Sequence, residues 1–533
     1  MFLRPLQQYR VSLHQFFLLV LVLACFAEAT AQQKPARQAN AARQPTATHP
    51  KNNIRQQNSS SQPTTTRQPN IIYIYADDLG YGELGSYGQQ KIKTPQLDQM
   101  AREGMRFTQH YSSAPVCAAA RCMLLTGKNA GHSYIRGNYE LGGFSDDKEA
   151  GQMPLPEGCF TLAKMLQKAG YTTGMSGKWG LGMAGTTGSP LKQGFDYYYG
   201  VLDQKQAHNY YPTHLWENDR WDSLPNPPLY VHQPLDSNTA TEADFNRFKG
   251  IQYAPAKMTE KALAFIDKNQ KKPFFLYLPY TLPHLSLQVP DEWVRKYIGQ
   301  FDEQPYYGQN GYTAHQYPKS AYAAMISYLD AQVGIILQEL KNRGLDDNTI
   351  VFFSSDNGAT MLKQANTAFF NSMGGLRGAK MDLYEGGIRE PLLVRWPKKI
   401  RPGTVNSQPS VQYDMMATFA ELAGIPVPAS TDGLSLLPAL LGKKQPVHEY
   451  LYFEYPENGG QVAIRLGDWK GIRVGVQKDP KAPWQLYNLA TDPAETNDLA
   501  AQQPAIIQRL NEIQRREHQP AHIKDWEIID PKF

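Results

Sequence analysis

The stretch Ile71-Ile72-Tyr73-Ile74-Tyr75-Ala76-Asp77-Asp78 decides the fold class of this chain. Its first six residues are β-branched, aromatic or small, a composition typical of a strand buried inside a sheet. The two carboxylates follow directly. In open α/β sheets, ligand-binding polar side chains gather just past the carboxyl ends of parallel strands. The stretch therefore predicts a central strand with a polar site at its end.

Strand-like and helix-like segments alternate after this stretch. Gly170, Gly344 and Gly424 follow three of the predicted helices, as expected at helix ends. The predicted helices cover 94–103 (with Thr94 as its cap), 160–169, 320–343 (amphipathic) and 413–423. The predicted strands cover 274–280, 349–354 and 392–396. This alternation predicts an α/β fold with a large mixed, mostly parallel sheet covered by helices on both faces.

The pattern changes after residue 440. The remaining predicted elements are strands at 450–455, 462–466 and 469–474 and a helix at 505–516. They predict a smaller C-terminal α+β subdomain over residues 441–533, behind a catalytic domain over residues 69–440.

The basic excess of the chain lies at its N-terminus. Residues 1–68 contain eight of the 54 Lys and Arg residues and one of the 49 Asp and Glu residues, so the remainder is close to neutral. A near-neutral body without a basic, aromatic-interleaved stripe argues against a nucleic-acid partner. Residues 32–68 are polar and lack apolar periodicity, which predicts a disordered linker.

An export signal is predicted over residues 1–31. Arg4 and Arg10 precede a short apolar run, and Ala29-Thr30-Ala31 is a small-x-small cleavage site. The run is too short to span a membrane comfortably. The signal predicts a periplasmic or secreted protein. A lipid anchor at Cys25 and a buried helix are the alternatives.

Four cysteines are too few for a disulfide framework, and their spacing does not fit a zinc site. Cys122 and Cys159 are predicted to be buried thiols without a bridge.

Two polar pairs follow predicted strands: Asp77-Asp78 and Asp356-Asn357. Carboxylate and amide oxygens together suit Ca²⁺, whereas zinc prefers His or Cys. Asp, Asn and Gly also favour turns, so a structural role remains open for either pair alone.

The most specific segment is Val116-Cys117-Ala118-Ala119-Ala120-Arg121. A lone cysteine of this kind is most often a buried core thiol. Here the segment resembles the signature of the formylglycine-dependent (type I) sulfatases: Cys, any residue, Pro or Ala, any residue, Arg. Segments similar to this family's other motifs occur in the family's order at 77–82, 126–127, 177–182, 283–284, 356–358, 377–380, 384–389, 486–489 and 492–495.

The resemblance implies an alkaline-phosphatase-like fold and a sulfatase mechanism. A separate maturation enzyme would oxidise Cys117 to formylglycine. One hydroxyl of the hydrated aldehyde attacks the sulfur of the ester, and the other then expels the sulfate as the aldehyde reforms, which is covalent catalysis. The resemblance also implies a Ca²⁺ ion bound by formylglycine at position 117 and by Asp77, Asp78, Asp356 and Asn357.

The same resemblance assigns roles to four further residues. Arg121, Lys178 and Lys380 would stabilise the charge of the sulfate group, and His284 would protonate the leaving alcohol. Outside these motifs, such residues are more often surface charges, local ion pairs or structural histidines.

One position departs from the family pattern. Gly180 stands where the second motif usually has a His that helps to hold or deprotonate the formylglycine. We hypothesise that another polar residue replaces it. The candidates are His208 and His214, which are also candidate substrate-binding residues.

The substrate is predicted to be a sulfated carbohydrate, and a sulfated galactose-type glycan in particular. Residues 208–216 and 453–460 mix aromatic, amide and acidic side chains, which suit sugar rings, although such loops can also be purely structural. A phosphoester or phosphonate hydrolase of the same superfamily is one alternative. A catalytically silent protein that binds sulfated glycans is the other.

Overall fold

The computed structural model describes residues 68–145, 148–361 and 363–529. The predicted export signal, the predicted linker up to residue 67 and Cys25 lie outside the described residues. The division at residues 440 and 441 also stays a prediction.

The large sheet is mixed and parallel at its centre. Its strands follow the order β12-β2-β11-β10-β1-β9-β5-β6-β7-β8, and β13 pairs with β2. The five neighbours from β10 to β6 are parallel, whereas β11, β7 and β8 pair in antiparallel fashion. The prediction of a mostly parallel sheet is confirmed. The bounds are β1 (Asn70–Asp77), β2 (Met105–Tyr111), β5 (Thr172–Lys178), β6 (Tyr197–Val201), β7 (His214–Glu217), β8 (Arg220–Ser223), β9 (Phe274–Pro283), β10 (Thr349–Ser355), β11 (Arg389–Arg395), β12 (Thr404–Asn406) and β13 (Ser410–Val411).

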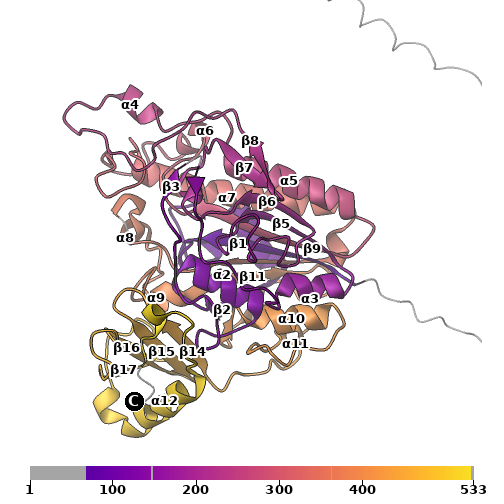
Figure 1. Cartoon of the computed structure of the whole chain (residues 1–533), viewed down its shortest axis with the longest axis vertical. Helices are drawn as coiled ribbons and strands as arrows, with labels where there is room; N and C mark the ends of the chain where they lie inside the picture. Colours follow the sequence, from indigo (N-terminus) through magenta and orange to yellow (C-terminus); the bar gives the residue numbers. More distant parts are fainter. Residues whose placement is uncertain (1–67, 146–147, 362, 530–533) are drawn as a thin grey trace, which may run out of the picture. The chain divides into compact units, whose positions relative to one another are not determined.

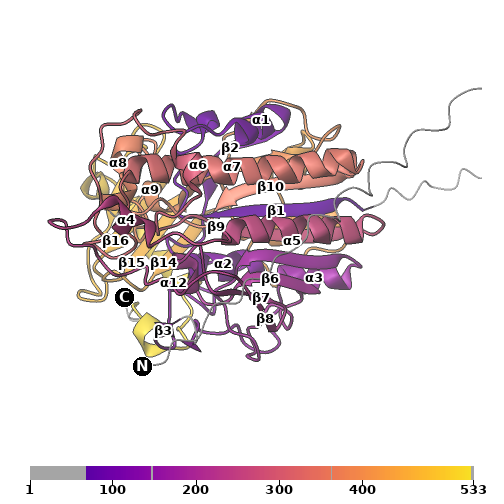
Figure 2. The same cartoon turned by 90° about the horizontal axis from the view of Figure 1, so that it is seen from above.

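Helices cover both faces of this sheet (Figure 1). Ile72 and Ile74 of β1 pack on one side, and Tyr73 and Tyr75 pack on the other, as the two-residue period of a strand requires. The first face carries α1 (Pro95–Glu103), α5 (Ala254–Asn269) and α7 (Pro318–Asn342). The second face carries α2 (Cys117–Thr126), α3 (Leu162–Lys168), α10 (Asp414–Leu422) and α11 (Leu437–Leu440). Figure 2 shows α5 and α7 lying roughly along strands β9, β1 and β10.

A separate antiparallel sheet follows, drawn in gold in Figure 1. It contains β14 (Leu451–Tyr455), β15 (Gln461–Leu466), β16 (Trp469–Val474) and β17 (Gln485–Asn488). Leu510 of α12 (Pro504–Glu517) packs on one face, and the other face packs against Ala119 and Met123 of α2. The small sheet therefore supports the helix that begins with Cys117.

The remaining elements are short and lie in the connections. They are β3 (Phe144–Ser145), β4 (Lys148–Glu149), α4 (Glu242–Asn246), α6 (Asp291–Val294), α8 (Thr367–Phe370), α9 (Glu385–Ile388) and the 3₁₀ turns at Gly85–Tyr87, Gln206–His208, Asp346–Asn348, Lys363–Ala365, Ala500–Gln502 and Lys524–Trp526.

Helix α7 differs from the predicted amphipathic helix. Its first half is buried on nearly every side because β9, α1, α5 and α6 surround it. Among the described residues it is the helix long and apolar enough to cross a membrane. However, 83% of its most apolar stretch is buried inside the protein. It is therefore a core helix.

Thr94 occupies the N-cap position of α1, as predicted, but the prediction that its side chain caps the helix is wrong. The Thr94 side chain makes no capping hydrogen bond and instead accepts one from the backbone of Gly85. The first-turn amides of α1 are satisfied by Asp330 of α7, whose Oδ1 accepts from the Leu97 amide at 2.7 Å and whose Oδ2 accepts from Gln96 at 3.2 Å. A carboxylate at a helix N-terminus also suits the helix dipole. The cap thus comes from a distant helix.

Replacing Asp330 with Ala is expected to lower the free energy of unfolding by about 2 kcal/mol, because two buried amides lose their acceptor. Urea denaturation measures the change. Asp219→Ala is the control, since Asp219 is exposed and, within the described part of the chain, its ion pair is a long contact to Arg220. This substitution should cost less than about 0.5 kcal/mol. Equal effects of the two substitutions would contradict the capping role.

Candidate active site

The carboxyl ends of four parallel strands meet at one edge of the large sheet. Strands β5, β9, β1 and β10 are consecutive neighbours, so the residues at their ends lie close together. These residues are Asp77 and Asp78 at β1, Lys178 at β5, His284 just after β9, and Asp356 and Asn357 just after β10.

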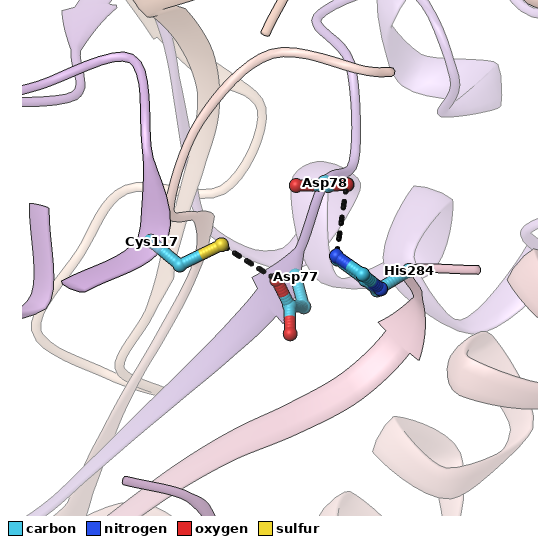
Figure 3. A group of neighbouring side chains, drawn as sticks. All are labelled: Asp77, Asp78, Cys117 and His284. Atoms are coloured by element: carbon cyan, nitrogen blue, oxygen red, sulfur yellow. Dashed lines mark hydrogen bonds and ion pairs between the residues drawn. The ribbon is translucent and has the colours of Figure 1, made fainter. Parts of the chain in front are cut away.

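Cys117 reaches this edge as the first residue of α2. Its thiol donates a hydrogen bond to Asp77 Oδ1 at 3.4 Å, and the side chain is almost completely buried. Candidate ligand atoms of Asp77, Asp78, Cys117 and His284 all lie within 4.8 Å of one another. In Figure 3, Cys117 and His284 approach the aspartate pair from opposite sides. The structure therefore joins three predicted motifs into one cluster.

Three cations pair with the carboxylates. Lys178 Nζ lies 2.7 Å from Asp77 Oδ2, and Lys380 Nζ lies 2.8 Å from Asp78 Oδ1. Arg121 Nη2 donates to Asp356 Oδ2 at 2.7 Å. Burying charges is costly unless they are paired and hydrogen-bonded, and each of these is. Lys380 is the most accessible of the three cations, with 15% of its side chain exposed, and its Nζ lies 3.7 Å from Cys117 Sγ.

The cluster sets the protonation of its members. Burial by itself raises the pKa of Asp77, but Lys178 and His284 hold this pKa well below its usual range. Burial raises the pKa of Asp356, and the neighbouring Asp77 carboxylate raises it further. Burial likewise raises the pKa of the Cys117 thiol, although Lys178 and Lys380 oppose the shift. The unmodified thiol is therefore a poor nucleophile.

The oxygen atoms of the cluster fit a hard divalent cation. Asn357 Nδ2 donates to Asp78 Oδ1 at 2.7 Å, whereas Asn357 Oδ1 is buried without a hydrogen-bond partner among the described residues. Such an unpaired oxygen beside crowded carboxylates is where a cation gains most. Asp77, Asp78, Asp356 and Asn357 all contribute oxygen, which suits Ca²⁺ better than zinc.

The ring of His284 is held in one orientation. Its Nδ1 lies 2.6 Å from the carbonyl oxygen of Leu285, which can only accept, so Nδ1 carries the hydrogen. Nε2 therefore faces Asp78 Oδ2, 3.6 Å away. Burial lowers the pKa of His284 to about 4, and the nearby Lys380 adds to the shift.

The structure places one of the two candidate replacements for the missing histidine at the site and the other away from it. The ring of His208 stacks on that of His284, with centroids 5.1 Å apart and planes 9° apart. His214 instead stacks on Trp221 and bonds to Gln206, and none of its described contacts reaches the cluster. Only His208 lies at the site.

Gln204 occupies the space beside Gly180. A Cβ atom built on Gly180 would lie 2.7 Å from Gln204 Cγ, and Gly180 has a φ of +75°, which disfavours other residues. A histidine at this position would therefore be both crowded and strained. Gln204, in a neighbouring loop, fills the space that a histidine at position 180 would need.

Two residues that sequence reasoning missed complete the surroundings of His284. The rings of His232 and Tyr312 both pack edge-on against that of His208, and Tyr312 also packs edge-on against His284. His232 Nε2 lies 3.3 Å from His208 Nδ1. Both belong to irregular loops without periodicity, and a lone His or Tyr in such a loop has no local signal.

Two other expectations need correction. Glu454 of the predicted substrate loop is buried and paired with Arg136 at 2.9 Å, so it stabilises the core. Cys159 is only partly buried, since it lies in the loop before α3, whereas Cys122 is fully buried as predicted.

A family model described as Sulfatase matches residues 69–425. The chain belongs to the sulfatase family. A second model, N-sulphoglucosamine sulphohydrolase, C-terminal, matches residues 379–519. This sulfatase is a sulfuric ester hydrolase of the alkaline-phosphatase-like superfamily, and the predictions of family, fold and enzyme class are confirmed.

The relatives of this sulfatase act on different esters. It is 33% identical to arylsulfatase A of Homo sapiens over 84% of this chain and 87% of that protein. It is 31% identical to N-acetylgalactosamine-6-O-sulfatase of Bacteroides thetaiotaomicron over 84% of this chain and 92% of that protein. The crystal structure of Ps i-CgsB in complex with k-i-k-neocarrahexaose is similar with a TM-score of 0.69 and 29% identity, covering 88% of this chain and 95% of that chain.

The crowding at Gly180 can be measured against Gly185, which has a φ of +82° and open space around it. Gly185→Ala is expected to cost about 1–2 kcal/mol from backbone conformation alone. Gly180→Ala should cost about 1 kcal/mol more, because its Cβ meets Gln204. A double-mutant cycle measured by denaturation tests this cause. Gly180→Ala made in the Gln204→Ala background, with Gln204→Ala alone as the reference, should lose this additional cost. Equal costs at the two glycines would show that Gln204 does not fill this space.

Proposed function

We propose that this sulfatase removes sulfate from a sulfated carbohydrate, using a formylglycine formed at Cys117 and a bound calcium ion. One observation carries the proposal. The side chain of Cys117 lies within 4.8 Å of candidate ligand atoms of Asp77, Asp78 and His284, at the ends of strands that are far apart in the sequence.

The chain offers a place for both groups. Asp77, Asp78, Asp356 and Asn357 would hold the calcium ion, which supplies a positive charge that polarises the sulfate group and favours an ionised nucleophile. Formylglycine at position 117 supplies a hydrated aldehyde, whose two hydroxyls allow attack on sulfur and later release of sulfate.

The side chains of the cluster divide the remaining work. Lys380 is partly exposed beside Cys117, so it binds a sulfate oxygen directly. Arg121 is already engaged by Asp356 and by the carbonyl of Lys178, and it holds α2 against the strand ends. Lys178 keeps Asp77 ionised.

His284 is the general acid in this proposal. Its Nδ1 hydrogen is committed to the Leu285 carbonyl, so Nε2 must first take up a proton. The doubly protonated ring then passes this proton from Nε2 to the oxygen of the leaving alcohol. His208 stacks on this ring, and we assign it a contact with the substrate beside the leaving group.

The relatives support a carbohydrate substrate. One relative is an N-acetylgalactosamine-6-O-sulfatase, and Ps i-CgsB was solved with a neocarrahexaose. Together with the aromatic and imidazole side chains around His284, they favour a sulfated sugar of galactose type. A small aryl ester is the alternative, since arylsulfatase A is also a relative.

The cellular setting follows from the N-terminus and from Cys117. We propose export to the periplasm or the exterior, directed by residues 1–31, with a lipid anchor at Cys25 as the alternative. Before Cys117 is modified, the protein's partner is a formylglycine-generating maturation enzyme.

The mass of the tryptic peptide 107–121, taken from protein exported by its native host, tests the modification. We expect Cys117 to have lost its sulfur and gained an aldehyde oxygen.

Cys117→Ala should abolish sulfate release, because no nucleophile remains. Cys122→Ala, a change at a buried thiol in the same helix, should retain it. An unmodified thiol in active protein would contradict the mechanism. Turnover of a phosphate ester in preference to the sulfate ester would point to the phosphoester hydrolase instead.

Calcium is expected to raise the melting temperature of chelator-treated protein, because an ion that binds only the folded state stabilises that state. The gain is about 2.7 kcal/mol when the free ion concentration is one hundred times the dissociation constant. Differential scanning calorimetry measures the shift. Asn357→Ala should weaken the response, since it removes the unpaired oxygen. Asn238→Ala, at an exposed site, should not. A larger shift with zinc than with calcium would overturn the choice of ion.

A further inference from the structure

A cavity of about 470 Å³ lies beside the large sheet, and none of the cluster residues lines it. We call it the Trp216–Trp221 cavity. Its lining includes Glu149, Ala150, Met183, Ala184, Trp216 and Trp221. Nothing in the mechanism above uses these side chains.

Two tryptophans form one wall of the cavity. Trp216 of β7 and Trp221 of β8 are directly paired across the hairpin, and their rings lie 6.1 Å apart at 89°. Trp221 is 49% exposed, although its ring is large and apolar. His214 stacks on this ring at 3.8 Å, so the indole is supported from one side. A rigid, half-exposed indole is a platform for a flat apolar surface.

Glu149 provides a polar contact in the same cavity. Its side chain is 2% exposed, and its Oε2 accepts a hydrogen bond from Trp216 Nε1 at 2.7 Å. Its Oε1 is buried without a hydrogen-bond partner among the described residues, and His214 Nε2 lies 3.6 Å away. A buried carboxylate oxygen that lacks a donor favours a ligand carrying one, such as a hydroxyl.

The strand register places the cavity near the catalytic cluster. Gly177 pairs with Gly200, Gly200 pairs with Trp216, and Trp216 pairs with Trp221. Three strand spacings therefore separate Trp221 from Gly177, about 14 Å between backbones. Gly177 directly precedes Lys178. An oligosaccharide spans this distance, whereas a monosaccharide bound at Cys117 does not.

We propose that the Trp216–Trp221 cavity is a remote sugar subsite, which binds a ring of an oligosaccharide substrate whose scissile sulfate lies at Cys117. The inference rests on the proposed function. The apolar face of a sugar stacks on Trp221, and a ring hydroxyl donates to Glu149 Oε1.

Steady-state kinetics of Trp221→Ala with two substrates test the subsite. With k-i-k-neocarrahexaose we expect KM to rise about tenfold, because an aromatic contact is lost. With 4-nitrophenyl sulfate, which is too small to reach the cavity, KM and kcat should stay within about twofold of the wild-type values. Trp221→Tyr keeps a ring and should restore most of the oligosaccharide affinity. Ile335→Ala, at an exposed site on α7, is the matched control.

The other outcomes are equally decisive. An unchanged KM for the hexasaccharide in Trp221→Ala, or an equal loss with both substrates, would overturn the subsite while leaving the sulfatase proposal intact. If wild-type protein releases sulfate from neither substrate, the proposed function fails. In that case calorimetry of the hexasaccharide with Cys117→Ala protein still tests the cavity. Binding that weakens on adding Trp221→Ala supports the subsite, and absent or unchanged binding rejects it.

Discussion

The neutralisation of buried carboxylates at the ends of β1 and β10 is the constraint on which the rest of the structure depends. Asp77, Asp78 and Asp356 lie almost completely inside the protein, where an unpaired charge is strongly unfavourable. Lys178, Lys380 and Arg121 each approach one of them within hydrogen-bond distance. These partners come from β5, from a late loop and from α2, so the cluster forms only when the fold is complete.

Arg121 links this electrostatic requirement to the position of Cys117. Its guanidinium donates to Asp356 and to the carbonyl of Lys178, one helical turn away from Cys117. Behind the helix, the small antiparallel sheet packs on Ala119 and Met123. The helix is thus held from both sides. A reactive group at its first residue gains the fixed geometry that catalysis requires.

The departure from the family motif at Gly180 lies beside this rigid edge. Gln204 fills the space that a larger residue at position 180 would need. The rings of His208 and Tyr312 pack against that of His284, and His232 packs edge-on against His208. Side chains on loops can vary without disturbing the charged cluster at the strand ends.

Sequence alone determined the features that depend on neighbouring residues. The β-branched and aromatic run at β1, the glycines that end helices and the ordered motifs located the sheet, the carboxylate pairs and Cys117, because local geometry and motif chemistry depend on consecutive residues. Tertiary structure alone decided which distant side chains meet. It brought Asp330 to the start of α1, excluded His214 from the cluster and set Glu149 against Trp216. The physical reason is that packing between helices and sheet, rather than spacing along the chain, sets contacts between residues that lie far apart in the sequence.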